Sequence, residues 1–388
     1  MSNSIHSDRL RTVRVSARRF ERSPFEDRWL NPDTVMGVYA GRYYSVFNGE
    51  NVEEDYWTLR RRAVLYDVPE RPVQISGPDA VRFLDHVFAR RVSSLGEGRG
   101  RYAIACDHNG RLFMDGVLFR LAADRFWYVQ PDGALETWLL AQSAGFDIAV
   151  TDPQSRVLQI QGPASFEIMA AATDGAITER MRYYHAGFFT IAGEDVYVSR
   201  TGWTGEMGYE VYTQGSATDC GKLWDHLLNA GKPHGLIVGS ISSMEIRRIE
   251  AGILDNGTDF DLSMTPFNAG LGAFIDLDKE NFIGKAALLR AERDAKRLFG
   301  LKCPGGIPGY REQILDGTKP VGHVTAGAWS PFLKSGIGYV RFDAPGSWSG
   351  RNLTVKTPDG GLLDCEILDL PFYDAEKRIP RGLERSVV

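Results

Sequence analysis

The sequence has few cysteines, and their spacing fits neither disulfide bonds nor a zinc site. Its 388 residues include four, Cys106, Cys220, Cys303 and Cys365, which are separated by dozens of residues. This spacing matches neither a disulfide framework nor a C-x-x-C zinc pair. The seven histidines include no H-E-x-x-H segment. We therefore expect a reducing compartment and no metal site.

Long apolar runs and an excess of positive charge are also missing. No stretch approaches the roughly 18 apolar residues that a membrane-spanning helix needs, and the N-terminus lacks the apolar segment of a secretory signal. The 45 basic and 50 acidic residues give a net charge of −5, so no global positive field favours nucleic acid. We expect a cytoplasmic protein with a small-molecule ligand and with neither a membrane nor a nucleic-acid partner. The sequence does not predict the oligomeric state.

The N-terminal segment is locally basic. The first 22 residues carry six arginines and two acidic residues. Organelle transit peptides and the basic arms of bacterial enzymes share this composition. We favour the arm, and the transit peptide stays open.

The length and the composition predict several folded domains. A chain of 388 residues is longer than one compact core usually organises. Its segment Val73-Gln74-Ile75-Ser76-Gly77-Pro78 is echoed by Leu158-Gln159-Ile160-Gln161-Gly162-Pro163. Each copy predicts a strand, a turn and a helix, because apolar residues at helical spacing follow each Gly-Pro pair. We expect two related α+β units, in each of which the helix lies on a sheet.

Other elements follow from periodicity and turn signals. Helices are predicted at residues 52 to 63, 218 to 230 and 240 to 251. Strands are predicted at 101 to 106, 111 to 121, 126 to 130, 188 to 191, 196 to 199 and 209 to 213, with a hairpin turn at Asn109-Gly110. Beyond about residue 297, short strands alternate with Gly/Pro turns, which is typical of a small β-barrel or sandwich. We expect units over 1–150, with the basic arm, over 151–290 and over 291–388.

Asp115 is the first candidate for chemistry. It lies within the apolar strand Leu112-Phe113-Met114-Asp115-Gly116-Val117-Leu118-Phe119. An unpaired ionised carboxylate there would cost several kcal/mol, so we expect it to have a partner. The alternative is a carboxylate that turns to solvent at a bulge beside Gly116.

Glu210 is the second candidate. It alternates with Tyr209 and Val211 and therefore shares a strand face with Gly208 and Tyr212. An ordinary outward-facing polar residue is the alternative. Tyrosines and tryptophans lie near both acids in the sequence, and rings beside a carboxylate suit a flat heteroaromatic ligand, although most buried aromatic residues are simply core.

A resemblance covers roughly residues 50 to 375. The stretch Ser199-Arg200-Thr201-Gly202-Trp203-Thr204-Gly205-Glu206-Met207-Gly208-Tyr209-Glu210-Val211-Tyr212 resembles the S-R-T-G-[YW]-T-G-E-x-G-[FY]-E-[IV]-Y motif of the glycine-cleavage T-protein (aminomethyltransferase) family. Further segments that resemble this family stand in the family's order along the chain, before and after this motif, at 73–80, 110–115, 248–252, 265–272, 281–288 and 322–327.

The resemblance implies an α+β, three-domain tetrahydrofolate-binding fold with a C-terminal β-barrel. It implies that Glu210 holds the pyrimidine edge of the pterin and that Asp115 is the catalytic aspartate near the one-carbon unit. It further implies that Tyr102, Trp203, Tyr212 and Arg248 line the folate pocket. The cofactor is then tetrahydrofolate, and the protein is an enzyme.

Departures from the family's pattern bear on the methyl donor. Aminomethyltransferases usually read D-V-S-H-M where this chain has Asp67-Val68-Pro69-Glu70-Arg71, and Met114 replaces a common first acid. The Glu70-Arg71 pattern is similar to dimethylsulfoniopropionate demethylases, which move a methyl group from sulfur to tetrahydrofolate. That branch has Y-N-H-M-L-L-P where this chain has Tyr39-Ala40-Gly41-Arg42-Tyr43-Tyr44-Ser45.

These rings favour a methoxylated aromatic acid, which related tetrahydrofolate-dependent O-demethylases use. An aryl methyl ether leaves as a phenolate and needs a proton donor, for which the candidates are His185, Tyr43 and Tyr44. Tyr43 and Tyr44 would also bind the substrate, and Trp329 would cover it. A sulfonium donor, an aminomethyl donor and a non-enzymatic folate-binding protein stay open as alternatives.

Overall fold

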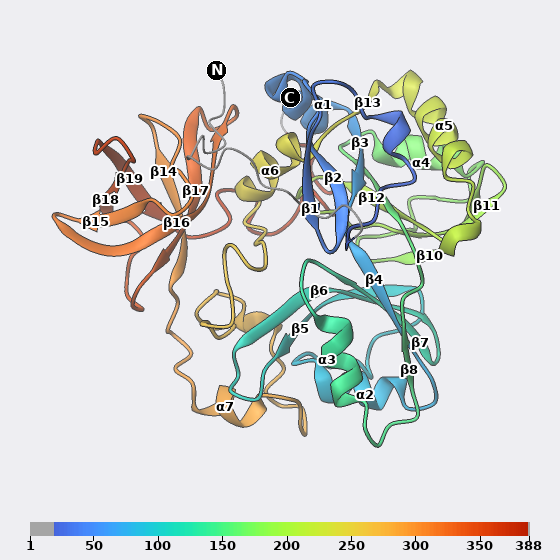
Figure 1. Ribbon diagram of the computed structural model, residues 1–388, viewed down its shortest axis with the longest axis horizontal. Coiled ribbons are helices and arrows are strands. Elements are labelled where there is room, and N and C mark those ends of the chain that lie inside the picture. Colours follow the sequence, from blue (N-terminus) through green and yellow to red (C-terminus); the bar gives the residue numbers. More distant parts are fainter. Residues whose placement is uncertain (1–18, 387–388) are drawn as a thin grey trace.

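Three lobes surround a central helix in the structure, a computed structural model that describes residues 19–386 (Figure 1). Two lobes are layered units of helices on sheets, and the third is a β-barrel on the opposite side of helix α6, Ile241–Glu250. The fold is therefore the α+β, three-lobed arrangement with a C-terminal barrel that the sequence predicts. Most of the predicted basic arm lies outside the described residues.

The first layered unit contains a five-stranded sheet. In spatial order its strands are β5 Arg99–Cys106, β6 Leu112–Ala122, β7 Arg125–Gln130, β4 Arg71–Ser76 and β8 Ala149–Thr151. Helices α2, Ala80–Val87, and α3, Leu135–Gln142, pack their apolar side chains against one face of it. The turn predicted at Asn109-Gly110 joins β5 to β6.

The second layered unit contains a six-stranded sheet. Its strands are β10 Ala186–Ile191, β11 Glu194–Ser199, β12 Gly208–Thr213, β9 Val157–Gln161, β3 Ala63–Val68 and β13 Leu236–Val238. Helices α4, Ser165–Ala172, and α5, Cys220–Gly231, cover its outer face. Strand β3 pairs with β9, although it precedes residue 150 in the chain. The domain boundaries at 150 and 290 stay a prediction.

The predicted internal repeat corresponds to two copies of one strand, turn and helix. Strand β4 leads into α2 and strand β9 leads into α4. Gly77 and Gly162, which stand at equivalent places, have φ angles of +133° and +124°. A Cβ atom on either would lie within 2.5 Å of a backbone oxygen, of Asp147 and of Arg62 respectively. Both copies therefore require glycine at the turn, for its φ angle and for space.

The two sheets face each other through a layer of aromatic side chains. Phe119 and Trp127 of the five-stranded sheet pack edge-on against Tyr197 and Tyr212 of the six-stranded sheet, with ring centroids 5.7 to 6.1 Å apart. Each sheet thus has helices on its outer face and the other sheet on its inner face. This arrangement explains why strands of both units are apolar on both sides.

Two further elements precede these sheets. A hairpin of β1, Val35–Tyr39, and β2, Arg42–Phe47, lies beside the sheets, and helix α1, Val52–Arg61, follows it. Asn51 accepts hydrogen bonds from the backbone N–H groups of Glu53 and Glu54 and so caps the start of α1. The predicted helices at 52 to 63, 218 to 230 and 240 to 251 are confirmed as α1, α5 and α6, within a few residues.

The third lobe is a closed barrel. Its strands, in spatial order, are β14 Leu298–Cys303, β17 Ser335–Phe342, β16 Lys319–Ser330, β15 Gln313–Asp316, β18 Asn352–Lys356 and β19 Leu362–Leu368, and β19 pairs with β14. A long segment that contains the short helix α7, Lys285–Arg290, links α6 to the barrel. After β19 the chain returns to the layered units.

Four buried charged side chains lie together beside the central helix, and we call them the buried ion cluster. Arg60 on α1, Glu206 before β12, and Arg247 and Glu250 on α6 have side chains that are 1% exposed or less. Arg247 Nε lies 2.7 Å from Glu206 Oε1. Ser386, near the end of the described chain, donates a 2.6 Å hydrogen bond to the same oxygen. The cluster therefore connects α1, α6, the six-stranded sheet and the C-terminal segment.

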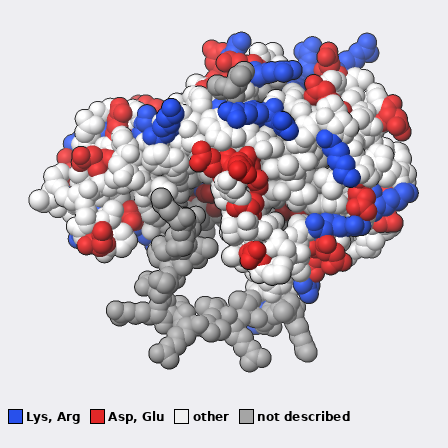
Figure 2. Space-filling view, turned by 90° about the horizontal axis from the view of Figure 1, so that it is seen from above, with Lys and Arg blue, Asp and Glu red and all other residues white. Residues whose placement is uncertain are grey.

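The surface carries both signs of charge. On the face shown in Figure 2, basic and acidic side chains are interspersed, with a group of acidic side chains near the middle of the view. This pattern agrees with the small net charge of −5. No helix within residues 19–386 combines the length and the apolar character that crossing a membrane demands.

Candidate functional site

A cavity of about 650 Å³ lies where the two sheets, the β1–β2 hairpin and the segments on either side of the barrel meet. This volume is in the range of small-molecule binding sites. Aromatic residues from several elements line it: Tyr39, Tyr44, Tyr102, Tyr183, Tyr184, Trp203 and Phe274. Asp115 and Glu210, the two acids singled out from the sequence, both line it. The fold thus brings residues from distant parts of the chain to one site.

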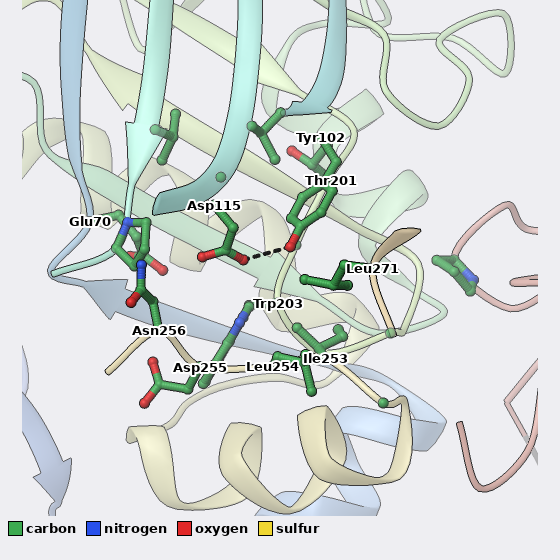
Figure 3. A pocket seen from close by; sticks show the side chains of 18 of the residues that line it. Glu70, Tyr102, Asp115, Thr201, Trp203, Ile253, Leu254, Asp255, Asn256 and Leu271 are labelled. Atoms are coloured by element: carbon green, nitrogen blue, oxygen red, sulfur yellow. Dashed lines mark hydrogen bonds between the residues drawn. The ribbon is translucent and has the colours of Figure 1, made fainter. Parts of the chain in front are cut away.

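Asp115 lies on β6, and its carboxyl group points into the cavity (Figure 3). The side chain is only 8% exposed, so it does not turn to bulk solvent. The hydroxyl of Tyr102, on the adjacent strand β5, donates a 2.7 Å hydrogen bond to Oδ2. The other oxygen, Oδ1, is buried and has no hydrogen-bond partner in the described part of the chain. The expected partner is therefore present for one oxygen, and the second is available to a ligand.

Burial sets the protonation of Asp115. Withdrawal from water raises its pKa to about 7, although the Tyr102 hydrogen bond lowers it. The same burial, together with the charge of Asp115, raises the pKa of Tyr102 well above its usual value, so Tyr102 keeps its proton and acts as the donor. Near neutral pH the Asp115 carboxyl group can therefore accept or release a proton, as a general base must.

Glu210 is held by its neighbours in the six-stranded sheet. Gln159, directly opposite on β9, donates from Nε2 to Oε1 at 2.9 Å. Tyr212, two residues along β12, donates to Oε2 at 2.8 Å, and the hydroxyl groups of Ser199 and Thr201 donate to the same oxygen. Burial raises the pKa of Glu210, and these hydroxyl groups oppose that effect. The carboxyl group is therefore fixed in place at the cavity wall, with lone pairs of Oε1 still unused.

The other predicted folate residues divide into two groups. Tyr102 and Trp203 line the cavity. Tyr212 and Arg248 lie behind the lining: Tyr212 orients Glu210, and the Arg248 guanidinium lies 5.2 Å from the Trp203 ring. Arg248 also pairs with Asp259 at 2.6 Å. These two residues can position the lining and are not themselves part of it.

The predicted substrate residues are not brought together. Tyr44 lines the cavity, whereas Tyr43, Trp329 and His185 are not among its lining residues. Tyr43 packs edge-on against Phe20, and the Trp329 side chain is 39% exposed on β16. His185 lies before β10, where its backbone carbonyl accepts from the backbone N–H of Arg200.

The structure adds acidic lining residues that the sequence analysis did not select as site residues. Glu70 and Asp255 line the cavity with Asp115, and in Figure 3 they and Asn256 are drawn on one side of Asp115, with Leu271 on the other. We call Glu70, Asp115 and Asp255 the acidic end of the cavity. The available sequence signal was an acid between two strands, because Glu70 lies two residues after β3 ends and immediately before β4 begins.

Glu70 bridges the two sheets. Strand β3 belongs to the six-stranded sheet and β4 to the five-stranded sheet, and only Pro69 and Glu70 lie between them. Arg42, which is 2% exposed, donates a 2.8 Å hydrogen bond to the Glu70 backbone carbonyl and so fixes this crossover. Burial, followed by the charge of Glu210, raises the pKa of the Glu70 carboxyl to about 8. Its Oε2 is buried and unpartnered among residues 19–386.

The described residues offer no ready metal site. Within residues 19–386 no group of three or more His, Cys, Asp or Glu side chains is arranged to hold a metal ion.

Comparison with known proteins assigns these features to a family. Residues 33–279 match the family model described as the GCVT N-terminal domain, and residues 296–374 match the glycine cleavage T-protein C-terminal barrel domain. An aminomethyltransferase of Caldanaerobacter subterraneus subsp. tengcongensis is 30% identical over 333 residues, which cover 84% of this chain and 88% of the relative. A dimethylsulfoniopropionate demethylase of Ruegeria pomeroyi is 30% identical over 360 residues, 89% of this chain and 95% of the demethylase.

A solved structure supports the fold. The crystal structure of glycine cleavage system aminomethyltransferase T from Bartonella henselae matches with a TM-score of 0.81, and the match covers 91% of this chain and 98% of that one. The two sequences are 22% identical in this match, so the likeness concerns the fold.

Proposed function

Because the chain belongs to the glycine-cleavage T-protein family, whose members use tetrahydrofolate as cosubstrate, we propose that it is a demethylase that transfers a methyl group from a small donor to N5 of tetrahydrofolate. The product is 5-methyltetrahydrofolate. One observation carries the proposal: a ligand-sized aromatic cavity holds the buried carboxyl group of Asp115 with one oxygen unpartnered in the described chain.

The residues present fit tetrahydrofolate. The Glu210 carboxyl group is fixed at the wall and can accept N–H groups of a pterin edge, while the rings of Trp203 and Tyr102 offer apolar faces to a flat heterocycle. Lys296 and Lys377 line the same cavity and can face the carboxylates of a folate tail. When bound, tetrahydrofolate supplies the nucleophilic nitrogen.

Asp115 would then act as the general base that accepts the proton of N5. Asp115 lines the cavity, its Oδ1 is unpartnered in the described chain and its Oδ2 is fixed by Tyr102, so the carboxylate can accept the proton that leaves N5 as the methyl group arrives. Burial excludes water from this carboxyl group and strengthens its interactions. The remaining contribution is positioning, because the acids and rings come from rigid strands.

A methoxylated aromatic acid is the donor that the sequence favours, and two features support it. The seven aromatic lining residues can stack on an arene. The raised pKa values of Glu70 and Asp115, about 8 and about 7, mean that either carboxyl group can carry a proton near neutral pH for a departing phenolate. This assignment stays a proposal.

A methylated cation such as a sulfonium is the second candidate, and the charge of the lining supports it. Carboxyl groups outnumber ammonium groups five to two among the lining residues: Glu70, Asp115, Glu210, Glu245 and Asp255 against Lys296 and Lys377. A positive donor would be attracted to this lining and to its aromatic rings, whereas the carboxylate of an aromatic acid would be repelled. The similar demethylase of Ruegeria pomeroyi acts on dimethylsulfoniopropionate, a sulfonium.

A methyl-transfer assay tests the proposed function. Purified protein is incubated with tetrahydrofolate and, separately, with dimethylsulfoniopropionate or a panel of methoxybenzoates, and 5-methyltetrahydrofolate is quantified by mass spectrometry. We expect product with one donor class. Absence of product with every donor would contradict the proposal, whereas methylene transfer from an aminomethyl donor would reassign the reaction.

A further inference from the structure

Glu70 has an unusual setting for a charged residue, because it lies at the crossover between two sheets and faces an apolar, aromatic cavity. Its Oε2 is buried and without a partner in the part of the chain that the structure describes. Its backbone is fixed by Arg42, yet the Arg42 guanidinium forms its ion pair with Glu21. Arg42 therefore fixes the position of Glu70 but forms no ion pair with its carboxyl group.

The groups around Glu70 add negative charge. Burial raises the pKa of Glu70 most, the charges of Glu210 on β12 and Asp67 on β3 raise it further, and Arg42 on β2 lowers it. Tyr39 on β1 is affected by the same negative charges. Burial and then the charges of Asp255, Glu70 and Asp115 raise its pKa well above the usual value. Tyr39 donates its hydroxyl to Asp255 Oδ1 at 3.2 Å. Three carboxyl groups therefore act on one hydroxyl group at the acidic end.

No salt bridge among the described residues includes Glu70 or Asp115, and the cations near the cavity have other partners. Lys296 lies 2.6 Å from Asp369, and Lys377 donates to the backbone carbonyl of Ala251 at 2.7 Å. Arg248 pairs with Glu245 and Asp259. The salt bridges of the described residues thus leave Glu70 and Asp115 without a cationic partner. Buried carboxyl groups in this situation either keep a proton or acquire a positive ligand.

Resting on the proposed function, we infer that Glu70 is the counter-ion of a positively charged methyl donor and that it releases its proton when this donor binds. The aromatic lining residues Tyr39 and Tyr44, whose rings lie 6.5 Å apart, provide faces that attract the same charge. When the methyl group leaves a sulfonium, the electron pair of the broken C–S bond stays on sulfur. The donor departs as a neutral thioether, its attraction to the Glu70 carboxylate is lost, and no proton donor is needed.

Binding measured without tetrahydrofolate tests this inference apart from turnover. The probes are dimethylsulfoniopropionate and 4-methylpentanoate, in which an uncharged carbon replaces the positive sulfur and the carboxylate is kept. Titration calorimetry at pH 7 in buffers of different ionisation enthalpy gives both the affinity and the number of protons released. Since the Glu70 pKa is about 8, we expect the sulfonium to release close to one proton from Glu70.

Variants separate the contribution of Glu70 from that of Asp115. In Glu70→Gln we expect at least half a proton less to be released and the sulfonium to bind roughly tenfold more weakly, while 4-methylpentanoate binds as before. Glu70→Asp keeps a carboxyl group and should retain the proton release if Glu70→Gln proves unstable. Glu97→Gln, at an exposed position, is the matched control and should change neither quantity.

The outcomes distinguish this inference from the proposed function. Equal proton release in wild type and Glu70→Gln, or a sulfonium that binds no more tightly than 4-methylpentanoate, would overturn the role of Glu70. If methoxybenzoates then yield 5-methyltetrahydrofolate, the proposed function stands without it. If the sulfonium binds with Glu70-dependent proton release and no donor yields product, Glu70 keeps its role and the demethylase assignment falls.

Discussion

The hydroxyl group of Tyr102 donates a 2.7 Å hydrogen bond to Oδ2 of Asp115 across two neighbouring strands, so the carboxyl group is fixed while its other oxygen has no partner in the described chain. A carboxyl group in this position can move a proton without having to rotate. Asp115 therefore offers the most direct test of the proposed chemistry.

Asp115→Asn should abolish proton acceptance and leave the shape of the cavity intact. We expect the rate of 5-methyltetrahydrofolate formation to fall by about 100-fold or more, the usual contribution of a general base. Tetrahydrofolate affinity, measured by titration calorimetry, should change less than about threefold. A variant that loses folate binding along with activity would show that Asp115 holds the cosubstrate and is not a base.

Stability should fall with rising pH because of the same residue. The Asp115 pKa is about 7 in the folded protein and 3.8 ordinarily, so between these values the folded state binds more protons than the unfolded state. The free energy of unfolding should therefore decrease as pH rises from about 4 to 7, by at most roughly 1.4 kcal/mol per pH unit from this group. Urea unfolding at pH 5, 6 and 7 should show a weaker dependence in Asp115→Asn. Identical slopes in the two proteins would contradict the raised pKa.

Glu210→Gln should weaken the binding of tetrahydrofolate. The substitution removes the negative charge that can accept N–H groups and sets an amide among the donors Gln159, Thr201 and Tyr212. We expect the dissociation constant to rise about 10- to 100-fold. Tyr212→Phe removes only one of the donors and should cost a few-fold at most. Unchanged affinity in Glu210→Gln would place the pterin elsewhere in the cavity.

Glu250→Ala should strongly destabilise the protein through the buried ion cluster. Glu250 accepts hydrogen bonds from Tyr56 at 2.7 Å and Ser330 at 2.6 Å, and lies 3.5 Å from Arg60. Its loss leaves two buried guanidinium groups short of negative charge, which typically costs roughly 3 to 5 kcal/mol. Urea unfolding measures this loss. The exposed Glu366→Ala should stay within about 0.5 kcal/mol of wild type.

Local patterns in the sequence predicted much of the fold and part of the site. The alternation of strand β12 puts Glu210 and Tyr212 on one face, and the Tyr212 hydroxyl does reach Glu210. The repeated strand, Gly-Pro turn and helix predicted the two layered units. The repeat is visible in the sequence because both turns require glycine. These features depend on the spacing of residues that are close together in the chain, and this spacing can be seen in the sequence itself.

Features that depend on long-range pairing could not be predicted. Nothing local shows that β3 joins the six-stranded sheet while β4 joins the other, and this crossover is what brings Glu70 to the cavity. The placement of Tyr43 and Tyr44, in contrast, depends on a local pattern, because successive residues of a strand point to opposite faces. Only one of them could face the cavity, and it is Tyr44. That part of the placement was available from the periodicity of the strand.

The buried ion cluster also constrains the order in which the protein can be completed during synthesis. Arg60 donates from Nε to Ser386 Oγ, a residue 326 positions later in the chain. While the ribosome is still making the barrel, the charges of Arg60, Glu206, Arg247 and Glu250 can already pair with one another, but Arg60 Nε and Glu206 Oε1 still lack the hydroxyl group of Ser386. We therefore expect the nascent layered units to assemble first and the C-terminal segment to close the cluster last.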